Sequence, residues 1–69
     1  MYYIYRIVDK KKEWLNIKVL GGQLIWTWKK HRAKAISFLS MREAIVTKKM
    51  YLKAFNISSK DVCIVFKRS

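Results

Sequence analysis

The stretch Trp14–Trp28, with the sequence WLNIKVLGGQLIWTW, decides the fold of this chain. Apolar residues recur at every second position on both sides of Gly21-Gly22, the only glycines in the sequence. Two adjacent glycines between two β-like runs predict a tight two-residue hairpin turn, because glycine adopts positive φ freely. The sequence therefore predicts antiparallel strands over Trp14–Leu20 and from Gln23 to about Trp28.

Pairing across this turn determines which side chains share a face, since directly opposed residues project the same way. One face collects six apolar residues, namely Leu15, Ile17, Val19, Leu24, Trp26 and Trp28. The opposite face is more polar and carries Asn16, Lys18, Gln23 and Thr27. We therefore expect both tryptophans of the second strand in the core and not on a base-stacking surface.

Further elements are predicted on both sides of this hairpin. They are a strand over Tyr2–Val8, a five-residue turn over Asp9–Glu13, a basic connection over Lys29–Lys34, a short extended piece around Ile36–Phe38 and a last strand from about Asp61 to Lys67. Carrying the register across the five-residue turn places Tyr3, Tyr5 and Ile7 on the core face. The outer face then holds four candidate contact residues, which are Tyr2, Arg6, Trp14 and Lys18.

A helix is predicted from about Met41 to Phe55. Ser40 and Glu43 have the spacing of a capping box, and Asn56 suits a left-handed helix stop. An apolar arc should face the sheet and comprises Met41, Ala44, Ile45, Tyr51, Leu52 and Phe55. Lys48 lies near the middle of this arc, so we expect its stem to pack while its ammonium group reaches solvent.

The order β-β-β-α-β predicts an α+β fold: a small antiparallel sheet with one helix packed on one face. With 69 residues, the chain has room for a single basic domain over residues 1–69. Its 52% hydrophobic residues make a packed core plausible and argue against disorder.

The chain carries 16 Lys and Arg residues against four Asp and Glu, a formal net charge of +12. Self-repulsion destabilises a compact chain of this charge, so the excess predicts an anionic partner. The cations gather after the second hairpin strand and along one helix flank, at Lys29, Lys30, Arg32, Lys34, Arg42, Lys49 and Lys53. The leading hypothesis is a small binding protein that contacts nucleic acid or a nucleoprotein complex mainly through phosphates.

Two other hypotheses remain open. The cations could instead dock on an acidic surface of another protein, where charge complementarity favours fast and specific association. Alternatively, the mixed outer face or a free sheet edge could form a homodimer.

Catalytic and metal-binding signatures are missing from the sequence. It has one histidine, His31, and one cysteine, Cys63, which lies in an apolar run and is expected to be a buried, inert thiol. No zinc spacing, nucleophile–base pair or glycine-rich phosphate loop is present. We therefore expect a non-enzymatic protein with no catalytic residues, no metal and no cofactor.

Composition also predicts where the protein acts. No apolar run approaches the ~20 residues needed to span a bilayer, and the first residues show no secretory signal pattern. A lone cysteine excludes an internal disulfide and fits a reducing compartment. We expect a cytoplasmic protein with no membrane partner.

One sequence pattern resembles a known class. Trp26-Thr27 followed by A-x-x-F-x-S-x-x-E-A over residues 35–44 is similar to a loose class of very short bacteriophage-encoded proteins with a hairpin, one helix and a final strand. The resemblance covers about Tyr3 to Phe66, and its motif positions are structural. The chain departs from the pattern in its extra basic residues between Thr27 and Ala35. The resemblance implies a host-directed role in the host cell cytoplasm, as an inhibitor or modulator of defence, transcription or replication machinery.

Overall fold

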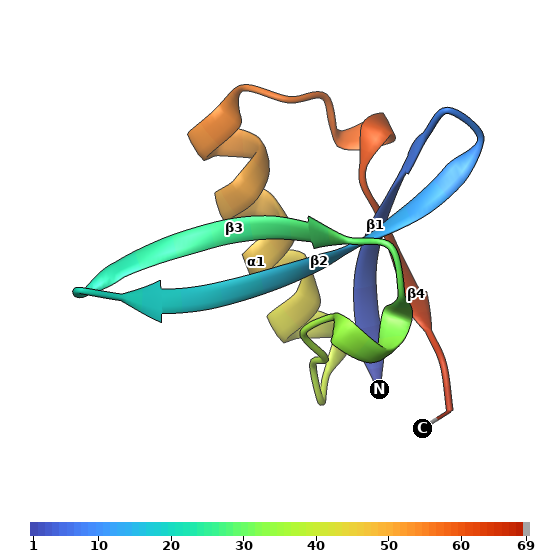
Figure 1. Cartoon of the computed structure of the whole chain (residues 1–69), viewed down its shortest axis with the longest axis horizontal. Coiled ribbons are helices and arrows are strands. Elements are labelled where there is room, and N and C mark those ends of the chain that lie inside the picture. The colour runs from blue at the N-terminus through green and yellow to red at the C-terminus, as the bar shows by residue number, and fades with distance from the viewer. Residues whose placement is uncertain (69) are drawn as a thin grey trace.

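A four-stranded antiparallel sheet with one α-helix on one face forms the body of the protein (Figure 1). The computed structural model describes residues 1–68. Its elements are β1 (Tyr2–Val8), β2 (Lys11–Leu20), β3 (Gln23–Lys29), α1 (Met41–Phe55), β4 (Cys63–Phe66) and two 3₁₀ turns, η1 (Arg32–Lys34) and η2 (Ser59–Asp61). The strands lie in the order β3-β2-β1-β4. This arrangement confirms the predicted α+β class.

The β2–β3 hairpin has the predicted turn and register. Gly21 and Gly22 both have positive φ, 58° and 78°, and the strands pair Ile17 with Trp26. Trp26 and its neighbour on the same face, Trp28, lie on the helix side, as expected. The Tyr51 ring of α1 lies 5.5 Å from the ring of Trp26 and 5.4 Å from that of Trp28.

The first turn differs from the prediction, and the difference inverts the whole of β1. Asp9 and Lys10 alone form the turn, with φ of 52° and 66°, so β2 begins at Lys11 and Val8 pairs with Lys11. A five-residue turn would have paired Val8 with Trp14, three residues further along. Because side chains alternate with a period of two, an odd shift moves each β1 side chain to the other face.

The corrected register exchanges the predicted inner and outer residues of β1. Ile4 is fully buried in the core, whereas Tyr3 and Tyr5 lie on the face turned away from α1. Tyr2 and Arg6, expected as outer-face contacts, lie instead on the helix side. The predictions for these residues were therefore wrong.

Lys10→Gly should stabilise the protein by about 0.5–1 kcal/mol. Lys10 has a φ of 66°, in the left-handed region that costs a residue with a Cβ atom about 1–2 kcal/mol. Glycine removes this strain but gains entropy in the unfolded chain, which offsets part of the benefit. Urea unfolding measures the change, and Lys10→Ala is the control because it removes the same charge and keeps the strain. Equal stabilisation by both variants would contradict the prediction.

The segment between η1 and α1 fills a gap in the sheet. β1 and β2 pair only from Tyr5 and Trp14 toward the first turn. Beyond that point the amide of Ile36 donates to the carbonyl of Leu15 at 3.0 Å, and Phe38 and Tyr2 exchange two backbone hydrogen bonds of 2.8 Å. The extended piece predicted at Ile36–Phe38 is confirmed, and it acts as a wedge between the two strands.

The helix has its predicted bounds, its left-handed stop and the serine half of the predicted capping box. The Ser40 side chain accepts a hydrogen bond from the Glu43 amide at 3.2 Å, and Asn56 closes the helix with a φ of 53°. Ala44 and Tyr51 are buried, together with Ile4, Leu15, Phe38 and Val62, in one core cluster.

Both ends of the predicted apolar arc stay exposed. Met41 and Phe55 are among the exposed large hydrophobic residues, as is Ile45 between them. Of the strands, it is β1, in the middle of the sheet, that α1 contacts most. Side chains at the margins of the arc are therefore left uncovered.

Two details of the C-terminal region also differ from the prediction. The last strand begins at Cys63, because Ser59–Asp61 form the turn η2. Cys63 itself is half-buried on the outer side of β4, not in the core. Within residues 1–68, no helix combines the length and the apolar content that crossing a membrane requires.

Candidate anion-binding surface

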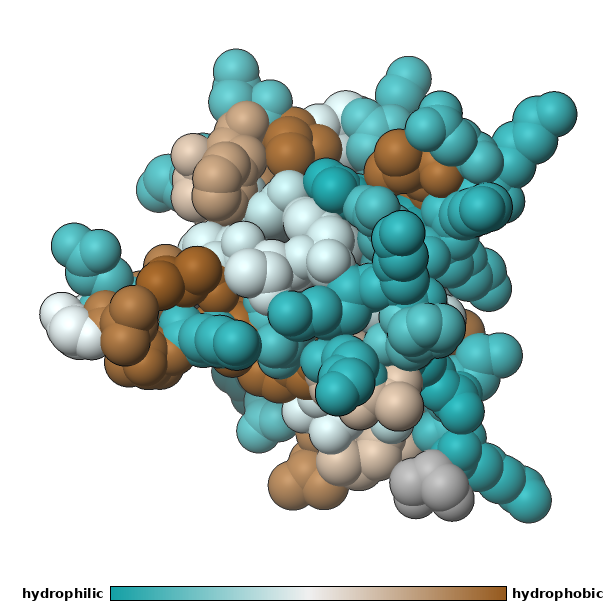
Figure 2. Space-filling view, viewed as in Figure 1, coloured by the Kyte–Doolittle hydropathy of each residue, from teal (hydrophilic) through white to brown (hydrophobic). Residues whose placement is uncertain are grey.

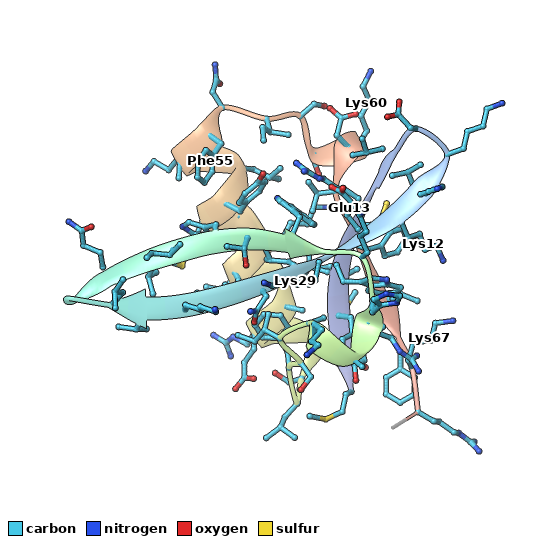
Figure 3. The ribbon with its side chains drawn as sticks, viewed as in Figure 1. Lys12, Glu13, Lys29, Phe55, Lys60 and Lys67 are labelled. Carbon is cyan, nitrogen blue, oxygen red and sulfur yellow. The ribbon has the colours of Figure 1, made fainter. Side chains whose placement is uncertain are left out.

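One row of residues crosses all four strands on the outer face, which is the sheet face turned away from α1. Tyr5 is the Cα partner of Trp14 on β2 and of Cys63 on β4. Trp14 is also the partner of Lys29 on β3, and paired residues project to the same face. Lys29 (labelled in Figure 3), the first residue of the predicted basic connection, therefore projects from the same sheet face as Trp14.

Three aromatic rings form the floor of this surface. The ring of Trp14 lies 6.1 Å from the ring of Tyr3 and 5.4 Å from that of Tyr5, between centroids. Trp14 is only 8% exposed even though it lies on the outer face. The prediction of its face is correct. Its proposed role as an open stacking ring is wrong, because its neighbours cover it.

Cations lie over these rings. The Lys12 Nζ atom lies 4.7 Å from the ring centre of Tyr5 and 5.8 Å from that of Trp14. The Arg32 guanidinium carbon lies 5.5 Å from the ring centre of Tyr3. Such contacts contribute about 0.5–1 kcal/mol each at exposed sites. We call this arrangement the outer-face platform; it consists of Tyr3, Tyr5, Trp14, Lys12, Lys29 and Arg32.

The tyrosine at the centre of the platform carries no negative charge at neutral pH. Burial raises the pKa of the Tyr5 phenol, and the adjacent Cys63 raises it further. A raised pKa favours the neutral form of a phenol, which ordinarily ionises near pH 10. The floor under the cations therefore does not neutralise them.

The single ion pair found among residues 1–68 lies on the other face. Arg6 donates from Nε to the Glu13 carboxylate at 2.8 Å, and a second guanidinium nitrogen lies 2.7 Å from the same oxygen. The guanidinium also stacks on Trp28 at 4.4 Å. Arg6 is thus held by contacts within the protein, and the Glu13 carboxylate is paired with Arg6 and not with a platform cation.

A depression of about 310 Å³ adjoins the platform. It is lined by Lys11, Lys12 and Lys30 together with Val8, Asp9 and Glu13. The structure thus brings the first turn and the basic connection together, although about twenty residues separate them in the sequence. Hydrophilic side chains predominate on this side of the molecule, around a smaller hydrophobic patch near the first turn, and a larger hydrophobic group lies at the tip of the β2–β3 hairpin (Figure 2).

The predicted binding residues fall on two separate surfaces. Lys29 and Arg32 belong to the platform and Lys30 to the adjoining depression, while Lys34 is exposed at the end of η1. Lys18 is exposed on the outer face of β2, where its register predicted it. The exposed helix cations, Arg42, Lys49 and Lys53, lie in the helix layer on the other side of the sheet.

Sequence reasoning missed Lys11 and Lys12, which it assigned to a turn. The signal that could have found them is the dipeptide Asp9-Lys10, since aspartate is common at the first position of a two-residue hairpin turn. With a two-residue turn at Asp9-Lys10, Lys12 pairs with Ile7 and its side chain lies on the outer face.

Comparison with known proteins adds no assignment. No family model matches the chain, and searches of curated proteins and of solved structures also returned no match. The similarity to short bacteriophage proteins therefore stays a prediction, and a function for this chain is inferred from the geometry of its surface.

Proposed function

We propose that this protein binds nucleic acid, alone or within a nucleoprotein complex, through the phosphates that the outer-face platform contacts. The observation that carries the proposal is the arrangement of Lys12, Lys29 and Arg32 around a neutral aromatic floor. Clustered cations repel one another when no anion is bound. Phosphates relieve this repulsion and release counterions from the nucleic acid, which favours binding.

The aromatic floor also prepares the cations for binding. A lysine or arginine side chain that rests on a ring has lost part of its rotamer freedom before the ligand arrives, so less entropy is lost on association. A guanidinium that stacks on a ring with its face keeps its edge N–H groups available for phosphate oxygens. Arg32 lies over the Tyr3 ring, with its guanidinium carbon 5.5 Å from the ring centre.

The platform favours backbone contacts over reading of base sequence. The α-helix lies on the opposite face of the sheet, and Trp14 is covered, so direct contacts to base edges or open base stacking have little support. We propose a role without catalysis. No group of three or more His, Cys, Asp or Glu residues within the described chain is placed to hold a metal ion.

Fluorescence anisotropy with labelled single-stranded and double-stranded oligonucleotides tests the proposal. We expect binding at about 50 mM salt that weakens as salt rises, with log affinity falling by about 0.9 per phosphate contact on duplex DNA and about 0.7 on single strands. No binding at low salt, or binding that does not respond to salt, would refute it. Affinity purification with and without nuclease distinguishes the alternative, an acidic host protein, because that partner would remain bound after nuclease treatment.

A further inference from the structure

A groove separates α1 from β4 on the helix side of the sheet, away from the outer-face platform. Its volume is about 360 Å³, within the range of ligand pockets. Its apolar walls are Met41, Ile45 and Leu52 of the helix and Ile64 of the strand. The groove exists because α1 packs mainly over β1 and leaves this margin of the sheet uncovered.

Lys48 lines this groove, which accounts for its position in the apolar arc. Its side chain is half-buried between apolar neighbours, and Lys49 lines the groove as well. No carboxylate of the described residues lies within ion-pair distance of either, since the one ion pair found there joins Arg6 and Glu13. The stem of Lys48 packs among the groove walls, as expected, and its ammonium group is available to an anion that enters the groove. The groove thus combines apolar walls with a preference for a negative group.

The edge of β4 beside the groove has free backbone hydrogen-bonding groups. β4 is the last strand of the sheet, and Met1 and Lys67 exchange backbone hydrogen bonds of 2.9 and 3.0 Å. In an antiparallel pair such bonds recur at every second residue, so Val65 and Cys63 also point their backbone groups toward β1. Ile64 and Phe66 therefore direct their N–H and C=O groups away from the sheet.

A strand added at this edge would place every second side chain in the groove. We propose that the α1–β4 groove binds an extended segment of a partner protein, which pairs with the free edge of β4. At successive groove-facing positions the segment carries an aliphatic side chain, which packs on Ile45 and Leu52, and a carboxylate, which binds Lys48.

Other occupants fit the groove less well. Nucleic acid offers no strand-like backbone for the free groups of Ile64 and Phe66, and its phosphates gain nothing from the apolar walls. A second copy of the chain would bring a second Lys48 and a second net charge of +12 to the same edge. An acidic, aliphatic peptide satisfies the backbone groups, the apolar walls and the charge together.

The probe is a pool of fluorescein-labelled heptapeptides. Val, Ile or Leu occupies the second and sixth positions, Glu occupies the fourth, and Ser or Thr fills the others. A second pool carries Gln in place of Glu. We expect the Glu pool to bind the full chain about tenfold more tightly than the Gln pool, the effect of one charge-assisted hydrogen bond. Lys48→Gln should abolish this discrimination. Lys53→Gln, with the same net charge and an exposed position elsewhere on α1, should preserve it.

A second pair of variants tests the backbone contact. Phe66→Pro removes an N–H that faces the free edge and also removes the ring, whereas Phe66→Ala removes the ring alone. We expect Phe66→Pro to bind the Glu pool several-fold more weakly than Phe66→Ala. Circular dichroism establishes that each variant is folded.

Several results would overturn the proposal. They are equal binding of the two pools, equal loss in Lys48→Gln and Lys53→Gln, displacement of the peptide by an oligonucleotide, and sedimentation showing a dimer that excludes the peptide. Replacement of Lys12, Lys29 and Arg32 by Gln should leave peptide binding within about twofold. Failure of the nucleic-acid proposal and failure of this one are therefore distinguishable.

Discussion

Replacing Lys12, Lys29 and Arg32 together by Gln should weaken oligonucleotide binding by about 10- to 100-fold at 50 mM salt. The nucleic-acid proposal assigns one phosphate to each cation, so the slope of log affinity against log salt should become shallower by about one for each cation removed. The aromatic floor remains intact in this variant, because glutamine keeps part of the packing and removes the charge. Anisotropy titrations over a salt series measure both quantities.

A matched variant shows whether position or net charge determines this effect. Replacing Arg42, Lys49 and Lys53 by Gln removes the same number of charges from the helix layer. We expect this variant to keep most of its affinity and nearly all of its salt slope, since these residues do not belong to the platform. Equal losses in the two triple variants would mean that binding responds to net charge alone, and the platform would then have no special role.

The largest expected effect on stability follows from the inverted register of β1. Ile4→Ala should lower the free energy of unfolding by about 2–5 kcal/mol, because Ile4 is fully buried and its truncation leaves a cavity. A chain of this length is stabilised by only about 3–10 kcal/mol in total. We therefore expect much of the population of this variant to be unfolded at 37 °C. Denaturant unfolding followed by tryptophan fluorescence measures the loss.

Ile7→Ala is the control for that experiment. Ile7 lies on the same strand and was expected on the core face, but it is 61% exposed. Its truncation should change stability by no more than about 0.5 kcal/mol. A larger loss for Ile7→Ala than for Ile4→Ala would restore the register expected from a five-residue turn.

The sequence predicted those elements whose signals are local. Gly21-Gly22 predicted the register of β2 and β3 because two adjacent glycines strongly favour a two-residue turn. Ser40 and Asn56 marked both ends of α1, since their side-chain and backbone preferences act on the helix ends directly. Each of these signals depends on neighbouring residues and not on distant packing.

The first turn carried only a weak local signal, Asp9, because the residue after it is lysine and not glycine. Lys10 adopts a left-handed conformation that its residue type does not favour, so composition alone suggested a longer turn. The three-residue error in register then moved Tyr3 and Tyr5 from the outer face to the predicted core. Half of the candidate site was missed in this way, because Lys12 and its aromatic neighbours depend on that turn. Lys29 and Arg32 were still identified, since the charge pattern of their own segment indicated them.

The place of β1 in the sheet has a consequence for how the chain is made. β1 is a central strand whose two neighbours are β2, which follows it at once, and β4, whose Phe66 pairs with Tyr2. During synthesis β1 can pair early with β2, and β2 with β3, because these strands are neighbours in the sequence. Residues 2–5 of β1 can pair with β4 only when nearly the last residues have been made. Contacts so distant in sequence are slow to form. The first half of β1 thus gains its β4 partner last, and a chain stalled before β4 would leave that edge of the central strand open to other strands.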